Sequence, residues 1–432
     1  MTVTALAGVP ARPLVAPLGR VVAGHALAWL VAANGVGLLL ATLLLVPELG
    51  GWMAPLTYGR WAAVHLDLEL YGWCALPLVG LLLRLYLSPR EASLGAAAVG
   101  LWSAALLAGA LSWLAGASSG KPFLDWTGPA NLLFLAAQLA LAAVLAAGLW
   151  RARPAGAAGA ARAWWGKAAL WLALLTVPVW LALGESRATY PPINPASGGP
   201  TGVSLLGSTL GVLWIFVATP AALGLQRRRA TPRSGGVVAL LVLHSVAFLL
   251  LDHGERTHRD ALEQVALGSL LLWAIVLPRY FAAYAWPVTL RRWRLAFLVW
   301  AGLLVASALA TFQPGVLDRL KFTDALVAHA HLAMAGMVSA FVLLLLAAAG
   351  PDELARGLDR PFPFTLWQAG CALQLLALTA AGWIESGDPG ATWRTAAELS
   401  TIGWLYLLRW LGGAAMLAAS IAWLAAARAE RS

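Results

Sequence analysis

The sequence predicts an all-α integral membrane protein, a single transmembrane domain over residues 1–432 built as a bundle of twelve membrane-spanning helices. Of its 432 residues, 61% are hydrophobic and 11% are charged, which is too apolar for a soluble domain of this length. A membrane-spanning helix needs about 20 mostly apolar residues, and twelve segments meet that requirement. Their approximate cores are 23–47, 61–87, 94–116, 128–150, 163–184, 204–226, 234–252, 262–284, 292–312, 322–349, 362–384 and 399–427. Residues 1–22 show no pattern of a cleavable signal peptide.

The distribution of positive charge predicts how this bundle is oriented. The formal net charge is +10, and if the N-terminus is cytoplasmic, most of the 29 Lys and Arg residues fall in cytoplasmic loops. This is the asymmetry of the positive-inside rule, so we expect both termini in the cytoplasm. The charge follows the loops, and it therefore indicates a lipid bilayer and not nucleic acid as the partner.

Two cysteines, Cys74 and Cys371, each stand alone in an apolar segment. Neither belongs to a C-x-x-C-H pattern, so no haem c is expected to be attached to this chain. We expect both to be small buried apolar residues.

The segment 322–349 carries two histidines, His329 and His331, inside an otherwise apolar run. A histidine within a membrane helix is by default a hypothesis of function. On an α-helix, residues two apart point about 200° from each other. The two side chains therefore cannot share one metal, but each can hold a different iron on opposite flanks of the helix.

The segment 61–87 contributes a third histidine, His65, at a similar depth in the outer half of the bilayer. One imidazole from each of two helices is what a six-coordinate haem iron needs. Asp67 and Glu69 follow, and Glu69 shares the helix face of His65 because it lies four residues further on. An ion pair at the outer interface and a role in proton handling both remain open for these acids.

Arg409 lies within the last apolar segment, where a buried guanidinium needs an anion. A haem propionate is one such anion, matched by bidentate hydrogen bonding. Pairing with Glu69 or Asp324 is the structural alternative.

Further metal-ligand side chains follow the segment 234–252. His253, Glu255 and His258 form a cluster that could bind a metal at the outer surface, although loops of this composition are usually solvated. His244 lies in the middle of the same segment.

Three stretches carry a resemblance to a known family. They are Gly59-Arg60-x4-His65, Thr323-Asp324-x4-His329-x-His331 and Arg409-Trp410-Leu411-Gly412-Gly413. Together they resemble subunit I of the haem-copper oxidase superfamily, closest to the catalytic subunit of the C-family, cytochrome cbb-type oxidases; the nitric oxide reductases come second.

The resemblance implies a twelve-helix fold in a bacterial-type inner membrane. It also implies that His65 and His331 are the axial ligands of a low-spin haem b, and that His329 is the protein ligand of a second, high-spin haem. A membrane-anchored c-type cytochrome, or quinol, would then be the electron donor.

The departures from the family concern its copper ion, which three histidines hold opposite the high-spin haem. Pro200 stands at the first of these positions, and His258 and Arg259 stand where a His-His pair is expected. The family's redox-active tyrosine has no counterpart, with Asp252 nearby. Copper needs nitrogen ligands in a defined geometry, and a guanidinium repels a metal ion. We therefore expect no copper centre, with His258 as at most a weak ligand of a second metal.

The sequence thus predicts a diverged membrane haem protein that takes part in respiratory electron transfer and whose own oxidoreductase turnover is left open. One alternative is a working oxidase or nitric oxide reductase with an unconventional second metal site. Another is a non-enzymatic haem protein, either a gas sensor or a structural subunit.

Overall fold

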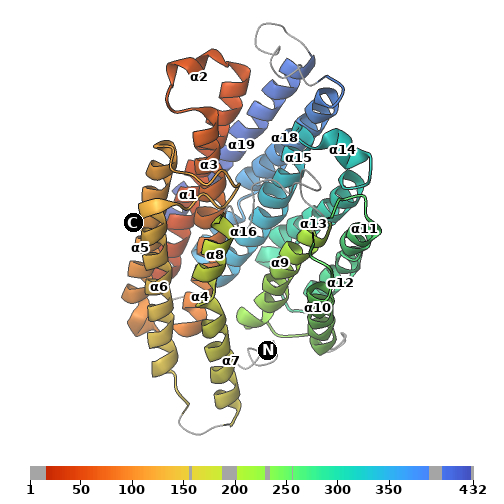
Figure 1. The fold of residues 1–432 in the computed structure, drawn as a ribbon. Helices are drawn as coiled ribbons and strands as arrows, with labels where there is room; N and C mark the ends of the chain where they lie inside the picture. Colours follow the sequence, from red (N-terminus) through yellow and green to blue (C-terminus); the bar gives the residue numbers. More distant parts are fainter. Residues whose placement is uncertain are drawn as a thin grey trace.

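The chain folds as a bundle of long helices in a computed structural model that describes residues 16–154, 158–186, 202–228, 234–254, 256–388 and 401–429. Within these ranges the only β-structure is one isolated antiparallel bridge between Arg227 and Tyr284. The helices run up and down side by side, with short connections at both ends (Figure 1). The expected all-helical, multi-pass membrane character is therefore confirmed.

In the described ranges, eleven helical segments are long and apolar enough to cross a membrane. They consist of α1 Ala16–Leu45; α3 Tyr58–Asp67, η2 Leu68–Cys74 and α4 Ala75–Tyr86; η3 Pro89–Glu91 and α5 Ala92–Leu114; α6 Gly128–Arg151; α7 Ala158–Leu174 and α8 Val177–Glu185; α9 Gly202–Ala222; α11 Ala261–Gly268 and α12 Leu271–Ala282; η4 Val288–Leu290 and α13 Arg291–Thr311; α15 Asp324–His331, η5 Leu332–Val338 and α16 Ser339–Ala349; α18 Pro361–Glu385; and α19 Thr401–Ala429. Three short helices, α2 Glu48–Trp52, α14 Val316–Leu320 and α17 Asp352–Leu358, lie in the connections.

The remaining expected span, 234–252, corresponds to a shorter helix, α10 Ser234–Leu249. Its 16 residues extend over about 24 Å at 1.5 Å per residue, less than the roughly 30 Å of a hydrocarbon core. The count of twelve spans and the cytoplasmic location of both termini stay predictions.

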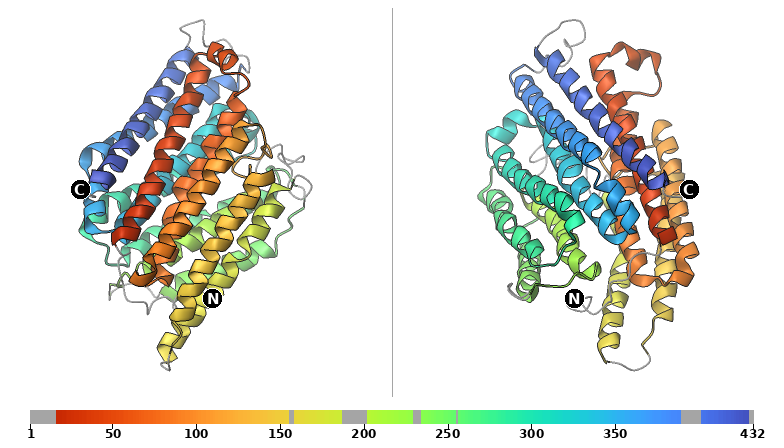
Figure 2. Two further views of the ribbon diagram at one scale, coloured as in Figure 1. Left: turned by 90° about the vertical axis from the view of Figure 1, so that its left-hand side faces the viewer. Right: turned by 180° about the vertical axis from the view of Figure 1, so that it is seen from behind.

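The helix formed by α15, η5 and α16 lies at the centre of the bundle (Figures 1 and 2). In the most apolar 18-residue stretch of this helix, 78% of the residues are buried, which is the highest share among the eleven segments. In the helix formed by α7 and α8 the corresponding share is 6%. A helix that is apolar on all sides is typical of such a central position. The neighbouring helices are therefore arranged around the segment that carries His329 and His331.

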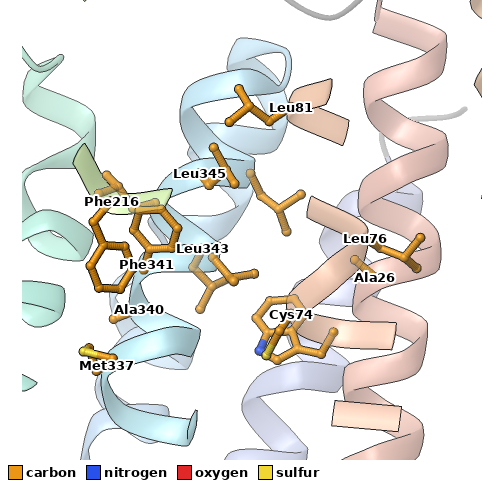
Figure 3. Close-up of a cluster of buried hydrophobic side chains, with 14 of the residues drawn as sticks. Ala26, Cys74, Leu76, Leu81, Phe216, Met337, Ala340, Phe341, Leu343 and Leu345 are labelled. Carbon is orange, nitrogen blue, oxygen red and sulfur yellow. The ribbon is translucent and has the colours of Figure 1, made fainter. Parts of the chain in front are cut away.

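The second half of this central helix, η5 and α16, packs against α4 and α9 through apolar side chains (Figure 3). Phe216 of α9 contacts Phe341 of α16 with ring centroids 4.6 Å apart. Cys74 lies among the aliphatic residues on the other side of α16. Both Cys74 and Cys371 are buried free thiols, as expected from the sequence.

Both helices that carry the key histidines change geometry directly after them. The π-helical segments η2 and η5, of seven residues each, begin within three residues of His65 and His331, respectively. Trp73 at the end of η2 donates a hydrogen bond to the Ser339 hydroxyl at 2.8 Å, and that hydroxyl donates to the carbonyl of Met334 in η5 at 2.8 Å. A π-helical turn often lies at a functional site, and these bonds tie the two π segments together.

Candidate functional site

The rings of His65 and His331 face each other between α3 and α15. Their centroids lie 6.3 Å apart and their planes differ by 25°. The sequence placed both at a similar depth, and the structure brings them together.

Each of these imidazoles is held at the same ring nitrogen. Nδ1 of His65 donates to the carbonyl oxygen of Ala33 in α1 at 2.8 Å, and Nδ1 of His331 donates to the carbonyl oxygen of Val327 at 2.8 Å. A carbonyl only accepts, so the proton must be on Nδ1 and the lone pair on Nε2. A second bond of this kind fixes the ring and its tautomer in metal-binding histidines. Both side chains therefore have Nε2 available as a metal ligand.

The spacing of the two rings fits one iron between them. A metal–imidazole bond is about 2.0 Å long, and the ring centroid lies about 1.1 Å behind the bonded nitrogen, so two imidazoles on opposite sides of one ion have centroids about 6.2 Å apart. The distance between His65 and His331 is 6.3 Å. The centroid distance thus agrees with that of two axial imidazole ligands on one haem iron.

The two rings line a cavity of about 200 Å³ between α1, α3, α15, α18 and α19. Its polar walls include Asn34, Glu69, Gln374 and Arg409. Among the described residues, buried Asn34 Nδ2, Gln374 Oε1 and Arg409 Nε have no hydrogen-bond partner. Unsatisfied buried donors and acceptors are costly, and here they surround the space that a polar-edged cofactor would fill.

Helix α1 leaves room for the His65 ring at one position. A Cβ atom on Gly37 would lie 2.8 Å from Cε1 of His65, closer than any ordinary contact. Together with the Ala33 carbonyl one turn earlier, Gly37 makes α1 the support of this imidazole. The sequence does not reveal this support, because neither a backbone carbonyl nor a glycine in an apolar segment is a signal in itself.

Arg409 pairs with Asp324, one of the three partners considered for it. Its guanidinium Nη1 lies 3.3 Å from Asp324 Oδ2, and both side chains are largely buried. Beside them, the Tyr406 hydroxyl donates to Glu385 at 2.7 Å, and the Asp324 amide donates to the same carboxylate at 2.8 Å. The ion pair leaves Arg409 Nε in the cavity wall.

The two acids that follow His65 face different surroundings. Glu69 lines the cavity together with His65. Asp67 is fully buried, and its polar neighbours are the backbone amide of Asp125 and the carboxyls of Asp125 and Glu185. An outer ion pair is therefore not seen for Asp67, and the role of both acids stays a prediction.

The loop between α5 and α6 places Asp125 near Asp67. Asp125 in this loop is buried, and burial raises the pKa of its carboxyl, while hydrogen bonds from Gly120 and Ser119 act in the opposite direction. Lys121 of the same loop is buried and donates to the carbonyls of Gly184 and Ser186 at the end of α8. These contacts give the loop a structural role.

His329 faces a second cavity, of about 290 Å³, on the opposite flank of the central helix. The walls come from α9, α11, α12, α13 and η5 and are almost entirely apolar. The Ser307 hydroxyl is hydrogen-bonded to Nδ1 of His329 at 3.1 Å, and the edge of Phe312 packs on the ring. The opposite directions expected for His329 and His331 are thus observed, since each lines one cavity and not the other.

His244 is fully engaged in hydrogen bonds outside this cavity. The Trp273 indole donates to its Nδ1 at 3.0 Å, and an indole can only donate. The proton is therefore on Nε2, which is bonded to the Ser269 hydroxyl at 2.9 Å. His244 is a satisfied structural histidine, so the possibility that it contributes a metal ligand is not supported.

His258 and its neighbours form an ionic cluster at the end of the bundle. His258 is buried, with Nε2 3.1 Å from Asp318 Oδ1. Arg259 and Lys321 contact the same carboxylate at 2.8 and 3.4 Å. The Arg259 hydrogen bond is the largest of the effects that hold the pKa of Asp318 well below its usual range. A metal beside His258 would meet two cations here.

The other residues considered for a second metal do not converge. Asp252 pairs with Arg256 at 2.5 Å, and His253 packs against the ring of Phe248. Glu255 and Pro200 lie outside the described residues. In the described part of the chain, no group of three His, Cys, Asp or Glu side chains is arranged to hold a metal ion. Whether copper binds stays a prediction.

Comparison with known proteins adds no assignment: no model of a known protein family matches the chain, and no curated protein sequence matches it.

Proposed function

We propose that this chain is a diverged relative of haem-copper oxidase subunit I that holds a low-spin haem b between His65 and His331 and a second, high-spin haem at His329. In this proposal it transfers electrons within a respiratory complex of a bacterial-type inner membrane and has no normal copper centre. The observation that carries it is the 6.3 Å separation of two imidazoles whose Nδ1 atoms are both bonded to backbone carbonyls.

The chain's own residues account for binding and orientation at the first site. His65 and His331 supply the two axial nitrogens, and the carbonyls of Ala33 and Val327 keep both rings in the metal-binding tautomer. Arg409 and Asn34 have free donors in the cavity wall and suit the carboxylates of a haem edge. A haem supplies reversible one-electron chemistry, and the buried bundle excludes water from it.

The second site differs because His329 is the one imidazole lining its cavity. One protein ligand leaves the opposite iron position open, and the apolar walls suit a small uncharged molecule such as a diatomic gas. Ser307 orients the ring through Nδ1. The described side chains of this cavity include two hydroxyls, Ser208 and Thr209, and no second histidine.

The electron donor has to be a separate molecule in this proposal. The chain has no C-x-x-C-H pattern, so a membrane-anchored c-type cytochrome or quinol is proposed as the donor. Quinol would reach the bundle through the lipid phase, whereas a cytochrome would dock at its outer end.

The experiment that tests the proposal measures iron and copper per chain in purified protein, together with reduced-minus-oxidised spectra recorded with and without CO. Two irons, no copper and one CO-sensitive haem are expected. One iron with no CO response would leave the His65/His331 haem alone and favour a relay or structural role. Copper near one per chain would favour the alternative of a working oxidase or nitric oxide reductase, and protein without iron would overturn the proposal.

A further inference from the structure

The turn between α14 and α15 holds a phenylalanine in a backbone conformation that bulky residues rarely adopt. Phe322 has a φ angle of 67°, in the left-handed region, where such a side chain is strained. The residue is 75% exposed, so packing against the chain offsets little of this strain. In contrast, Phe123, which also has a positive φ, is half-buried and its carbonyl accepts a hydrogen bond from Tyr71 at 2.7 Å. Strain without compensating packing is typical of functional positions.

Hydrogen bonds on both sides of Phe322 hold the turn in place. Before it, the amide of Lys321 donates to the carbonyl of Leu317 at 2.8 Å. After it, the amide and the hydroxyl of Thr323 both donate to the carbonyl of Leu320, at 3.1 and 2.7 Å, and the Thr323 side chain also caps α15. These bonds fix an exposed aromatic ring at the start of the central helix.

Three basic side chains lie at the same turn. Arg259 and Lys321 contact the carboxylate of Asp318 at 2.8 and 3.4 Å. Arg319 donates to the hydroxyl of Ser386 at 2.8 Å. Arg259 is 66% exposed, and Arg319 is exposed as well. Among the described contacts of these three cations, Asp318 supplies the one carboxylate. Arg259, Arg319, Lys321 and the ring that follows them are called the Phe322 patch below.

Two acids of the connection before α11 are engaged elsewhere. Asp252 forms an ion pair with Arg256 at 2.5 Å, and Asp260 accepts a hydrogen bond from the amide of Thr257 at 3.1 Å. The cations of the Phe322 patch are therefore in excess over the carboxylate that contacts them. A surface of this kind favours a partner that carries negative charge.

The Phe322 patch lies outside the membrane-spanning segments and close to both histidine cavities. The neighbouring spans end at Thr311 and begin at Asp324, so the turn between them is beyond the apolar phase, at the same end of the bundle as α2 (Figure 1). His329 and His331 follow Phe322 by seven and nine residues, which corresponds to about 10–14 Å along a helix. A molecule bound at the patch would therefore lie close to both proposed haem sites.

We propose that the Phe322 patch is the docking surface for the acidic face of a c-type cytochrome that donates electrons to this chain. The ring of Phe322 provides an aromatic anchor, whose burial on docking supplies the apolar contact that the free protein lacks. The surrounding cations attract and orient an oppositely charged partner. Quinol is uncharged and moves within the lipid, so a charged surface beyond the apolar phase favours the cytochrome. The inference rests on the proposed function for the identity of the partner, whereas docking itself requires no haem.

The first test measures how two soluble c-type cytochromes of opposite net charge, one acidic and one basic, bind to the protein in phosphatidylcholine nanodiscs. Surface plasmon resonance should show binding of the acidic cytochrome alone, weakening as salt is added. Arg319→Gln/Lys321→Gln should slow its association about tenfold. The control Arg90→Gln/Arg356→Gln removes the same charge from exposed arginines of η3 and α17 and should leave association unchanged. Equal slowing in both variants would mean that only overall charge matters, and would overturn the site.

A second variant, Phe322→Gly, separates docking from a structural role of the ring. Glycine adopts a positive φ without strain, so the thermal unfolding midpoint should rise while the acidic cytochrome dissociates about tenfold faster. The control Phe362→Gly removes a ring that is 74% exposed from the first turn of α18, so its midpoint should fall and its docking should not change. A lower midpoint with unchanged docking in Phe322→Gly would assign the ring to folding or to lipid contact, and would overturn the proposal.

Iron content distinguishes a failure of this inference from a failure of the proposed function. Protein that contains iron but does not bind the acidic cytochrome through the patch would overturn the docking surface alone. Protein without iron that still binds the acidic cytochrome, with the losses expected for the patch variants, would support the docking surface and overturn electron transfer as its purpose.

Discussion

The two cavities on either side of the central helix differ in the side chains that surround their histidines. On one flank, His331 meets His65 from a second helix within a wall that also carries Asn34, Gln374 and Arg409. On the other flank, His329 is the one histidine among the described residues that line an apolar cavity. Two residues apart on one helix, a histidine thus meets a second imidazole on one flank and an almost entirely apolar wall on the other.

The difference follows from the neighbouring helices and not from the histidines. Toward α1 and α3 the wall brings a second imidazole and buried polar atoms without partners. Toward α9, α12 and α13 it brings aliphatic side chains, and the histidine of that region, His244, is turned outside the cavity into bonds with Trp273 and Ser269. The comparison therefore predicts that one substitution can remove haem binding on one flank and leave ligand binding on the other flank intact.

The largest effect is expected from His65→Ala. With one of two axial nitrogens gone, the bis-histidine haem spectrum should disappear almost completely, while CO binding at the other flank persists. Visible and electron paramagnetic resonance spectra of the purified variant measure this. The control is His25→Ala, because His25 is bonded to Ser103 at 2.7 Å and lines neither cavity; unchanged bis-histidine spectra in the His65 variant would refute the assignment.

The converse variant, His329→Ala, should leave the low-spin haem in place and abolish CO binding. The reason is that His329 is the one imidazole of its cavity, so no described side chain replaces it. CO difference spectra measure the loss, with His244→Ala as the matched control from the same half of the bundle. If CO still binds to the His329 variant, the high-spin ligand is another group.

Periodicity and depth were enough to predict how the histidines are arranged. The two-residue spacing of His329 and His331 placed them on opposite flanks because helical geometry is local. The similar depth of His65 placed it level with both histidines of the central helix, and the choice of His331 as its partner was what the family resemblance implied. Burial of Cys74 and Cys371 followed from their apolar surroundings. In each case a local rule determined the outcome.

The supporting contacts depended on packing between helices and were not predictable. The partner of Arg409 was one of several anions until the approach of α15, α18 and α19 selected Asp324. Asp67 and Glu69 are two residues apart in the sequence, but they face different neighbours. The shortness of α10 and the π-helical segments η2 and η5 also depend on tertiary contacts, as the bond from Trp73 to Ser339 illustrates.

The smallest but most specific effect is expected from Gly37→Ala. The new methyl group would lie 2.8 Å from Cε1 of His65, so the ring has to tilt and its bond to the Ala33 carbonyl weakens. Loss of such a supporting contact typically lowers metal affinity 10- to 100-fold, and we expect about a tenfold weaker retention of the low-spin haem with a shifted electron paramagnetic resonance signal. Haem content after dialysis and that spectrum provide the measurement.

Gly35 on the same helix separates this effect from a general effect on α1. A Cβ atom at Gly35 has nothing within 4 Å, so Gly35→Ala should stabilise the helix by about 0.5–1 kcal/mol and leave the haem signals unchanged. CO binding at His329 should be unaffected in both variants because α1 does not line that cavity. Identical haem signals in the two variants would mean that α1 does not orient His65, and the asymmetry between the flanks would then rest on the second imidazole alone.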